Sequence, residues 1–266
     1  MSADGKRLLL AERVARSTGF ARRRRLGALA LAALGVACAG AGLISFEPPA
    51  HIVSETGFAP HRLKALSIIQ VSILTICAAA LGYWATPRLG LYSIIVDGIP
   101  RLSASMLVFL IIGMGGGVAS WAVDAALVKR LPLLEAFQSA HDAQLTGLEA
   151  LANPTMRLAY GGVTEEILVR YGLFSGMAVA AGILLKHRIS ALGFAAILSS
   201  ALFGVGHLPA ILAFVPDAPT LFLIKTVVLN TAVASLFAMV FVLHSLEASM
   251  ATHAGFHLAL LALGRL

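Results

Sequence analysis

The stretch LGALALAALGVACAGAGLI, residues 26–44, decides the class of this protein. It holds 19 residues without a charge, and the basic run Arg22 to Arg25 stands directly before it. A helix needs about 20 apolar residues to cross the hydrocarbon core of a bilayer, whereas the apolar part of a cleaved signal peptide has roughly 7–15. The stretch therefore predicts a retained membrane-spanning helix.

The rest of the chain has the same character. Of its 266 residues 59% are apolar and 12% charged, with a mean hydropathy of +0.89, whereas soluble domains carry about 25% charged residues. Lipid offers the backbone no hydrogen-bond partners, so each span must be helical. We predict an all-α fold, a polytopic membrane helix bundle of about 7–8 transmembrane helices enclosing a polar cavity. Seven segments qualify as spans: residues 26–44, 65–84, 103–128, 156–184, 189–206, 221–243 and 246–263.

The count depends on residues 91–99, which are too short to cross and are followed by Pro100. We expect this segment at the membrane surface or as a re-entrant piece, which would add an eighth element. The chain divides into a basic N-terminal tail (1–25), N-terminal transmembrane helices with a connector (26–154), and a transmembrane core (155–266) to which catalytic residues are assigned below.

The distribution of charge predicts the orientation. The net charge is +7, and eight of the twenty basic residues lie in the first 25 positions. This is a positive-inside signal and not a nucleic-acid patch, so we expect a multi-pass membrane protein with a cytoplasmic N-terminus and no nucleic-acid partner. The short Ala-rich and Arg-rich chain is typical of bacteria, so the expected location is the bacterial inner membrane. Cys38 and Cys77 each lie in an apolar span, which excludes a disulfide framework.

Two segments concern packing. After the third span, apolar residues recur near helical spacing, which predicts either an amphipathic surface helix or a plain connecting helix; they are Leu133, Leu134, Phe137, Leu145, Leu148 and Leu151. Gly113 and the triplet Gly115 to Gly117 would permit close helix packing.

Some polar residues in the spans carry weaker signals. Asp124 and Lys225 lie near span ends and are expected to reach the membrane surface. Asn230 is deeper, where we expect an interhelical hydrogen bond. Glu247 lies at a helix start, where the helix dipole favours an acid.

The fourth span contains YGGVTEEILVR, residues 160–170, and so places two adjacent carboxylates and an arginine in an apolar setting. Ionisable residues are costly there, and they indicate function by default. Positions four apart share a helix face, so Glu166 and Arg170 are predicted to pair. Adjacent positions point about 100° apart, so we expect that Glu165 and Glu166 do not address the same partner. Glu165, left without an in-helix counter-ion, is the candidate general base.

Histidines on two other spans complete the set. His207 ends the fifth span, and antiparallel neighbours would bring it level with Glu165. His253 and His257 share one face of the last span. Two roles fit these residues. Either His207, His253 and Glu165 or His257 bind zinc, or Glu165 activates water while histidines orient it without a metal.

The order Glu-Glu-x-x-x-Arg, Phe-x-x-x-His and His-x-x-x-polar, each on a separate apolar helix, resembles the CAAX protease and bacteriocin-processing (CPBP or Abi) family of intramembrane endopeptidases. Here the motifs are residues 165–170, 203–207 and 253–257, about a third of the chain. The family usually has Asn or Asp where this chain has His257.

The resemblance implies a helical core with a conical cavity and a hydrophobic or lipid-anchored peptide substrate in membrane lipid. It also implies catalytic roles for Glu165, Glu166, His207 and His253, with His257 at the fourth position. Eukaryotic members cleave prenylated CAAX proteins. Two alternatives remain: a non-catalytic membrane scaffold or immunity protein that keeps the polar residues for packing, and a proton- or metal-coupled transporter.

Overall fold

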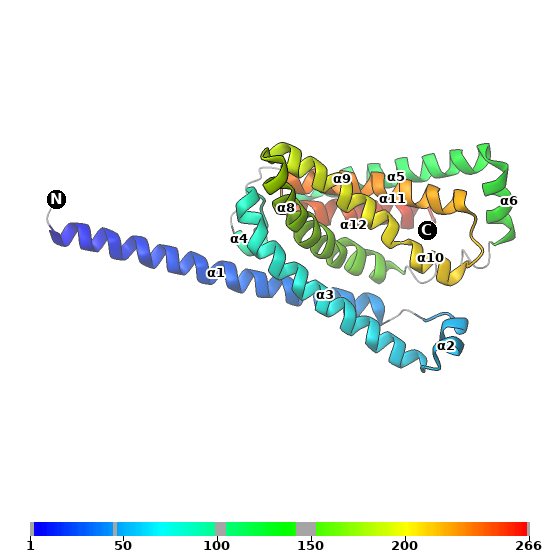
Figure 1. Cartoon of the computed structure of the whole chain (residues 1–266), viewed down its shortest axis with the longest axis horizontal. Coiled ribbons are helices and arrows are strands. Elements are labelled where there is room, and N and C mark those ends of the chain that lie inside the picture. Colours follow the sequence, from blue (N-terminus) through cyan, green and yellow to red (C-terminus); the bar gives the residue numbers. More distant parts are fainter. Residues whose placement is uncertain (1–2, 45–46, 99–104, 142–152, 265–266) are drawn as a thin grey trace.

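A computed structural model describes residues 3–44, 47–98, 105–141 and 153–264, and within them every regular element is a helix (Figure 1). The side chains are described from residue 19 onward. The helices are α1 (Ala3–Leu43), α2 (Ala50–Thr56), α3 (Pro60–Leu89), α4 (Ile94–Asp97), α5 (Met106–Arg130), α6 (Pro132–Ala140), η1 (Met156–Glu165), η2 (Ile167–Phe174), α8 (Ser175–Leu185), α9 (Arg188–Gly206), α10 (Leu208–Phe214), α11 (Thr220–Leu243) and α12 (Leu246–Ala262). The predicted all-α polytopic bundle is confirmed.

Within the described residues, six stretches of helix are long and apolar enough to cross a membrane: Gly19–Leu43, Pro60–Leu89, Met106–Arg130, Met156–Leu185, Arg188–Phe214 and Thr220–Leu243. They correspond to the first six predicted spans. The seventh prediction falls on α12, whose 17 residues extend about 26 Å, short of the roughly 30 Å hydrocarbon core. The exact count of seven or eight crossings is therefore not confirmed by the helices described.

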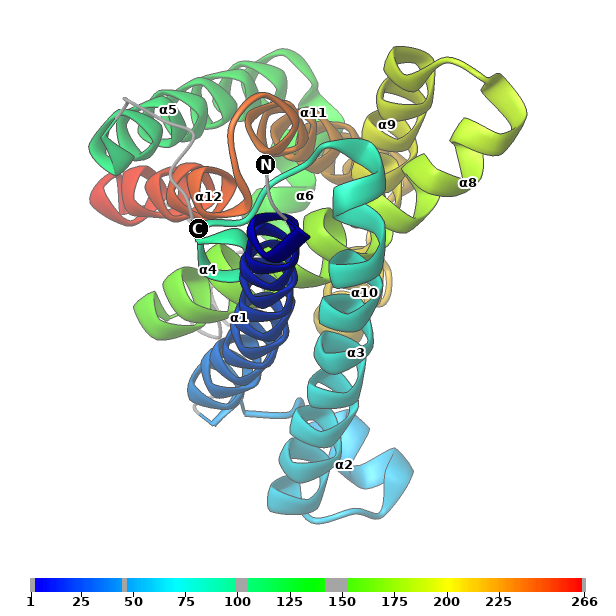
Figure 2. The same cartoon turned by 90° about the vertical axis from the view of Figure 1, so that its left-hand side faces the viewer.

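The helix α1 begins at Ala3 and not at the start of the first apolar stretch, so the basic tail is itself helical. In Figure 1 its N-terminal part extends beyond the rest of the bundle. Figure 2 views the molecule from this end, where α4 and the turn between α8 and α9 also lie.

The polar groups at this end hold α4 in place. Glu247, at the start of α12, accepts hydrogen bonds from the Ser93 hydroxyl at 2.7 Å and from the backbone N–H groups of Ile94 and Ile95 at 2.8 and 3.1 Å. Arg24 pairs with Asp97 at 2.8 Å. The short segment predicted not to cross is thus the four-residue helix α4; Ile99 and Pro100 lie outside the described residues.

Close packing at glycines sets the position of α12 against α5. A Cβ on Gly113 would lie 1.8 Å from the carbonyl oxygen of Thr252, and one on Gly255 would lie 2.1 Å from the carbonyl oxygen of Leu110. Only glycine permits this approach of two backbones. Gly117 likewise faces the backbone of Phe256, so the predicted packing role holds for two members of the glycine cluster.

The predicted amphipathic connector is partly described. Its first turns form α6, where Leu134 and Phe137 are buried in a cluster with Ile211, Val215 and Phe222. Leu145, Leu148 and Leu151 lie outside the described residues. The part that is described covers one end of the bundle beside α10 (Figure 1).

The fourth span departs from ideal α-helix. From Met156 to Phe174 its backbone is largely π-helical, in η1 and η2, before α8 continues as an α-helix. π-helical turns have i→i+5 hydrogen bonds, are rare, and occur frequently at functional sites. They place more residues in each turn, so neighbouring side chains diverge by less than in an α-helix.

Candidate active site

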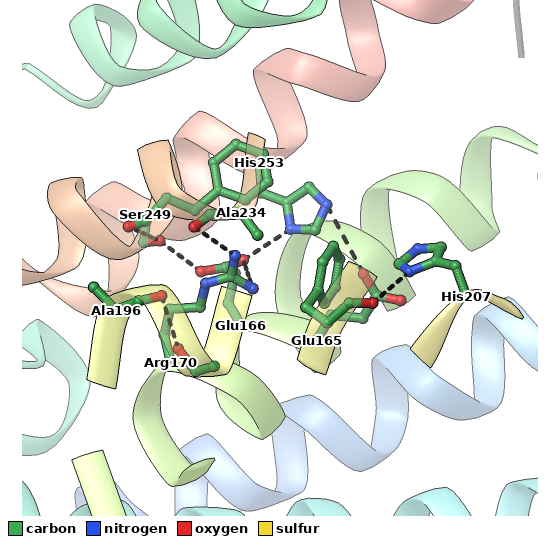
Figure 3. A network of polar contacts seen from close by, with 11 residues as sticks. Glu165, Glu166, Arg170, Ala196, His207, Ala234, Ser249 and His253 are labelled. Atoms are coloured by element: carbon green, nitrogen blue, oxygen red, sulfur yellow. Dashed lines mark hydrogen bonds and ion pairs between the residues drawn. The ribbon is translucent and has the colours of Figure 1, made fainter. Parts of the chain in front are cut away.

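Glu166 lies at the centre of a buried polar network, between η1 and η2 (Figure 3). Its side chain has no exposed surface. Oε1 lies 3.2 Å from Arg170 Nη1 and 2.8 Å from His253 Nδ1, and Oε2 lies within hydrogen-bond distance of the Ser249 hydroxyl. A buried carboxylate needs such partners, because desolvation without them costs several kcal/mol (~2–7 even for a neutral polar group).

Arg170 is held on several sides. Its guanidinium, 1% exposed, donates from Nη2 to the carbonyl of Ala234 at 3.0 Å and pairs with Glu166. It also lies 5.0 Å from the ring centroid of Phe203 and 5.3 Å from that of Phe237. Both distances permit cation–π attraction, which strengthens where water is excluded. The ion pair predicted from the i and i+4 spacing is present in the structure.

Both glutamate side chains lie close to His253, whereas the sequence predicted that they have different partners. Nδ1 of His253 bonds to Glu166 at 2.8 Å, while Nε2 lies 3.9 Å from Oε2 of Glu165. Two features allow this arrangement. The imidazole carries its nitrogens on opposite sides of the ring, and the π-helical backbone reduces the angle between adjacent side chains.

The environment of Glu165 differs from that of its neighbour. Its side chain is 19% exposed, and no hydrogen bond joins it to another residue in the described part of the chain. At 3.9 Å the gap to His253 is too long for a direct hydrogen bond, and a contact of this length is one that water often bridges. Glu165 is thus the partly exposed carboxylate of the pair.

The hydrogen bond to Glu166 sets the tautomer of His253. A carboxylate only accepts hydrogen bonds, so Nδ1 carries a proton and donates a hydrogen bond to Glu166. In the neutral ring Nε2 then presents a lone pair toward Glu165. The ring stacks on Phe237, with centroids 4.3 Å apart and planes 25° apart. Its orientation is therefore fixed by packing as well as by hydrogen bonds.

His207 enters the site from the C-terminal end of α9. Its Nδ1 donates to the carbonyl of Phe203 at 2.8 Å, so Nε2 is unprotonated in the neutral ring and a donor in the imidazolium. The ring of Phe203 stands edge-on to His207 at 4.6 Å and to His253 at 6.1 Å. His207 and Glu165 form no hydrogen bond or ion pair within the described residues. In the view of Figure 3 the Glu165 carboxylate points toward the space between the two histidines.

His257 stacks on His253, with centroids 4.8 Å apart, and its Nδ1 is buried with no hydrogen-bond partner among the described residues. Space for the ring comes from Gly161, where a Cβ would lie 2.8 Å from Nε2 of His257 and 3.8 Å from Nε2 of His253. The glycine before the two glutamates therefore shapes the wall of the site.

The donor arrangement does not fit the zinc alternative. Zinc holds nitrogen and oxygen ligands at about 2.0–2.2 Å, usually from three or more side chains. Among the described residues no group of three or more His, Cys, Asp or Glu side chains is arranged to hold a metal ion. The set considered from the sequence, His207, His253, His257 and Glu165, does not converge in this way, so assignment to the metalloproteases is not supported.

Sequence reasoning missed several contributors to this site. Ser249 contacts Glu166, and its spacing signals this role, because Ser249, His253 and His257 repeat at intervals of four on one helix face. No local pattern marks Phe237, which comes from α11.

Two of the weaker sequence predictions are wrong. Lys225 is 7% exposed and pairs with Asp124 at 2.6 Å, so the lysine joins an interhelical ion pair instead of reaching the surface, while Asp124 stays 35% exposed. Asn230 donates to the carbonyl of Thr226 one turn earlier in its own helix, and not to another helix.

Comparison with known proteins adds one finding. Residues 148–259 match the family described as type II CAAX prenyl endopeptidase Rce1-like. The matched segment contains every polar residue of the site, from Glu165 to His257. No curated protein and no solved structure gave a significant match to the chain.

Proposed function

We propose that this multi-pass membrane protein is an intramembrane endopeptidase that hydrolyses peptide bonds with glutamate-activated water, because residues 148–259 match the Rce1-like family and the sequence motifs resemble the CAAX proteases. The observation that carries the proposal is the position of His253 between a buried and a partly exposed glutamate.

Glu166 acts as a positioning residue. It holds the proton of His253 on Nδ1 and is itself fixed by Arg170. This leaves the lone pair of Nε2 beside the carboxylate of Glu165. A water molecule that donates one hydrogen to each group has its oxygen free to attack a carbonyl carbon.

Glu165 is the general base. As the water oxygen bonds to the carbonyl carbon, Glu165 takes the proton, and it returns this proton to the leaving nitrogen as the C–N bond breaks. His207 lies where its ring, in the imidazolium form, donates Nε2–H to the negative oxygen of the tetrahedral intermediate. His257, with a buried nitrogen left unpaired, is the second candidate for that role.

The substrate follows from the place of the site. Its residues lie on helices built to contact lipid, and such a site receives peptides that are already at the membrane. We propose a hydrophobic or lipid-anchored peptide, for which prenylated CAAX peptides are the first probe because the matched family is named for them.

The test uses purified protein in lipid vesicles, with farnesylated, geranylgeranylated and unprenylated hydrophobic peptides. Glu165→Gln should lower cleavage about 10²–10⁴-fold, the usual contribution of a general base, without lowering thermal stability. Glu135→Gln, at an exposed carboxylate of α6, is the matched control and should cleave normally. Cleavage at the wild-type rate by Glu165→Gln would overturn the role of Glu165. A wild-type protein that cleaves no peptide would instead favour the scaffold function.

Metal dependence is tested on the same preparation. Because the donors do not converge on one point, we expect a chelator to leave cleavage unchanged and elemental analysis to find no stoichiometric metal. Loss of cleavage on chelation, with recovery on adding zinc, would contradict this expectation.

A further inference from the structure

A pocket lies at the end of the bundle opposite α10, where α3 ends and α8 turns into α9. Figure 2 faces this end. Three basic residues, Arg88, Lys186 and Arg188, line it together with the apolar side chains of Leu89, Ala178 and Val179. The site described above does not include any of these residues.

The three basic residues belong to different elements but converge without an acidic partner. None of them forms an ion pair with an Asp or Glu among the residues described. By contrast, Arg24 nearby is paired with Asp97. A cluster of unneutralised cations favours an anionic ligand.

The structure fixes two of these cations in place. The Arg188 Nε donates to the carbonyl of Leu89 at 2.8 Å, which leaves its remaining N–H groups for other acceptors. Arg88 donates to the carbonyl of Trp84, and its guanidinium lies 4.3 Å from the centroid of the Trp84 ring. Tryptophan is enriched where the hydrocarbon core meets the headgroups, so Trp84 indicates that the pocket lies at that level.

The first turn of α9 adds to the attraction. It begins at Arg188, and the N-cap residue His187 makes no side-chain cap hydrogen bond to its first backbone N–H groups. Such a helix end carries about half a positive charge. Beside the pocket, Ile183 and Leu184 are 75% and 81% exposed, as suits contact with acyl chains.

We propose that this pocket binds the headgroup of an acidic phospholipid, with the phosphate between Arg88, Lys186 and Arg188 and the acyl chains along α8. The pocket lining combines three basic side chains with apolar ones, and the exposed apolar residues Ile183 and Leu184 of α8 lie beside it. A basic pocket between transmembrane helices is a known form of headgroup site. This inference does not depend on the proposed peptidase activity.

The test is native mass spectrometry of the full-length delipidated protein, titrated with phosphatidylglycerol and, separately, phosphatidylcholine. The pocket variant is Arg88→Gln with Lys186→Gln, which leaves Arg188 bound to Leu89. The control is Arg22→Gln with Arg25→Gln, which removes two exposed charges of α1 at the same end of the molecule.

We expect wild type and control to prefer phosphatidylglycerol and the pocket variant to bind it roughly tenfold or more weakly, as for two basic residues at an anionic headgroup. Millimolar inorganic phosphate should not displace the lipid. Equal loss in pocket and control variants would show general surface attraction and overturn the proposal. An unchanged preference in the pocket variant would do the same, and displacement by phosphate would assign the pocket to a free anion.

Discussion

Replacement of Glu166 by glutamine tests whether the buried ion pair is structural. The Arg170 guanidinium, 1% exposed, would lose its carboxylate contact at 3.2 Å, for which the described residues offer no replacement ion pair. It would keep the Ala234 carbonyl and the two phenylalanine rings, none of which carries a charge. Removing one partner of a buried pair typically costs about 3–5 kcal/mol, because the other charge is left uncompensated. We expect a loss of stability of that order for Glu166→Gln.

The double variant Glu166→Gln with Arg170→Met sharpens the test. It removes both charges, and neutral replacements of a buried pair are often as stable as the pair itself. Most of the lost stability should return, which gives a coupling energy of about 2–3 kcal/mol or more in the cycle. Cleavage should not return, because no carboxylate then fixes the proton of His253.

The assay is unfolding in mixed detergent micelles, followed by the fluorescence of the two tryptophans. The matched control is the pair Lys64 and Glu47, whose side chains are 21% and 72% exposed and whose removal should change stability little. If Glu166→Gln is as stable as the wild type, the structural interpretation of the pair is wrong. The same holds if the double variant loses as much stability as Glu166→Gln and Arg170→Met lose together when measured singly.

Further variants test the packing. Gly161→Ala should lower cleavage several-fold, since its Cβ would lie 2.8 Å from His257 Nε2. Gly115→Ala is the control, because no heavy atom lies within 4 Å of its Cβ, and it should cleave normally. Normal peptide cleavage by Gly161→Ala would contradict this. Asp124→Asn should lower the melting temperature more than Lys225→Met. The first variant leaves Lys225, 7% exposed, without its carboxylate, whereas the second leaves Asp124, which is 35% exposed and so costs less to leave unpaired. Thermal melts of both variants measure the order, and a reversed order would argue against it.

The sequence alone determined the features that depend on neighbours along the chain. Long apolar stretches predicted the spans, because a helix must satisfy its own backbone in lipid. The pairing of Glu166 with Arg170 followed from positions four apart. The order of the three polar motifs was enough to predict the family, and the match over residues 148–259 supports that prediction.

Tertiary structure decided which helices meet, and at what depth. His253 lies between two glutamates for two reasons. The backbone contacts of Gly113 and Gly255 set the axial position of α12 against α5, and the fourth span is π-helical.

The pairing of Asp124 with Lys225 and the basic pocket of α3, α8 and α9 have the same origin. A periodic pattern shows which face of a helix is polar, but it holds no information on the rotation and axial shift of one helix against another. Side-chain packing between distant segments sets this rotation and axial shift. They in turn decide which of the polar residues named from the sequence contact one another, and hence the role of each.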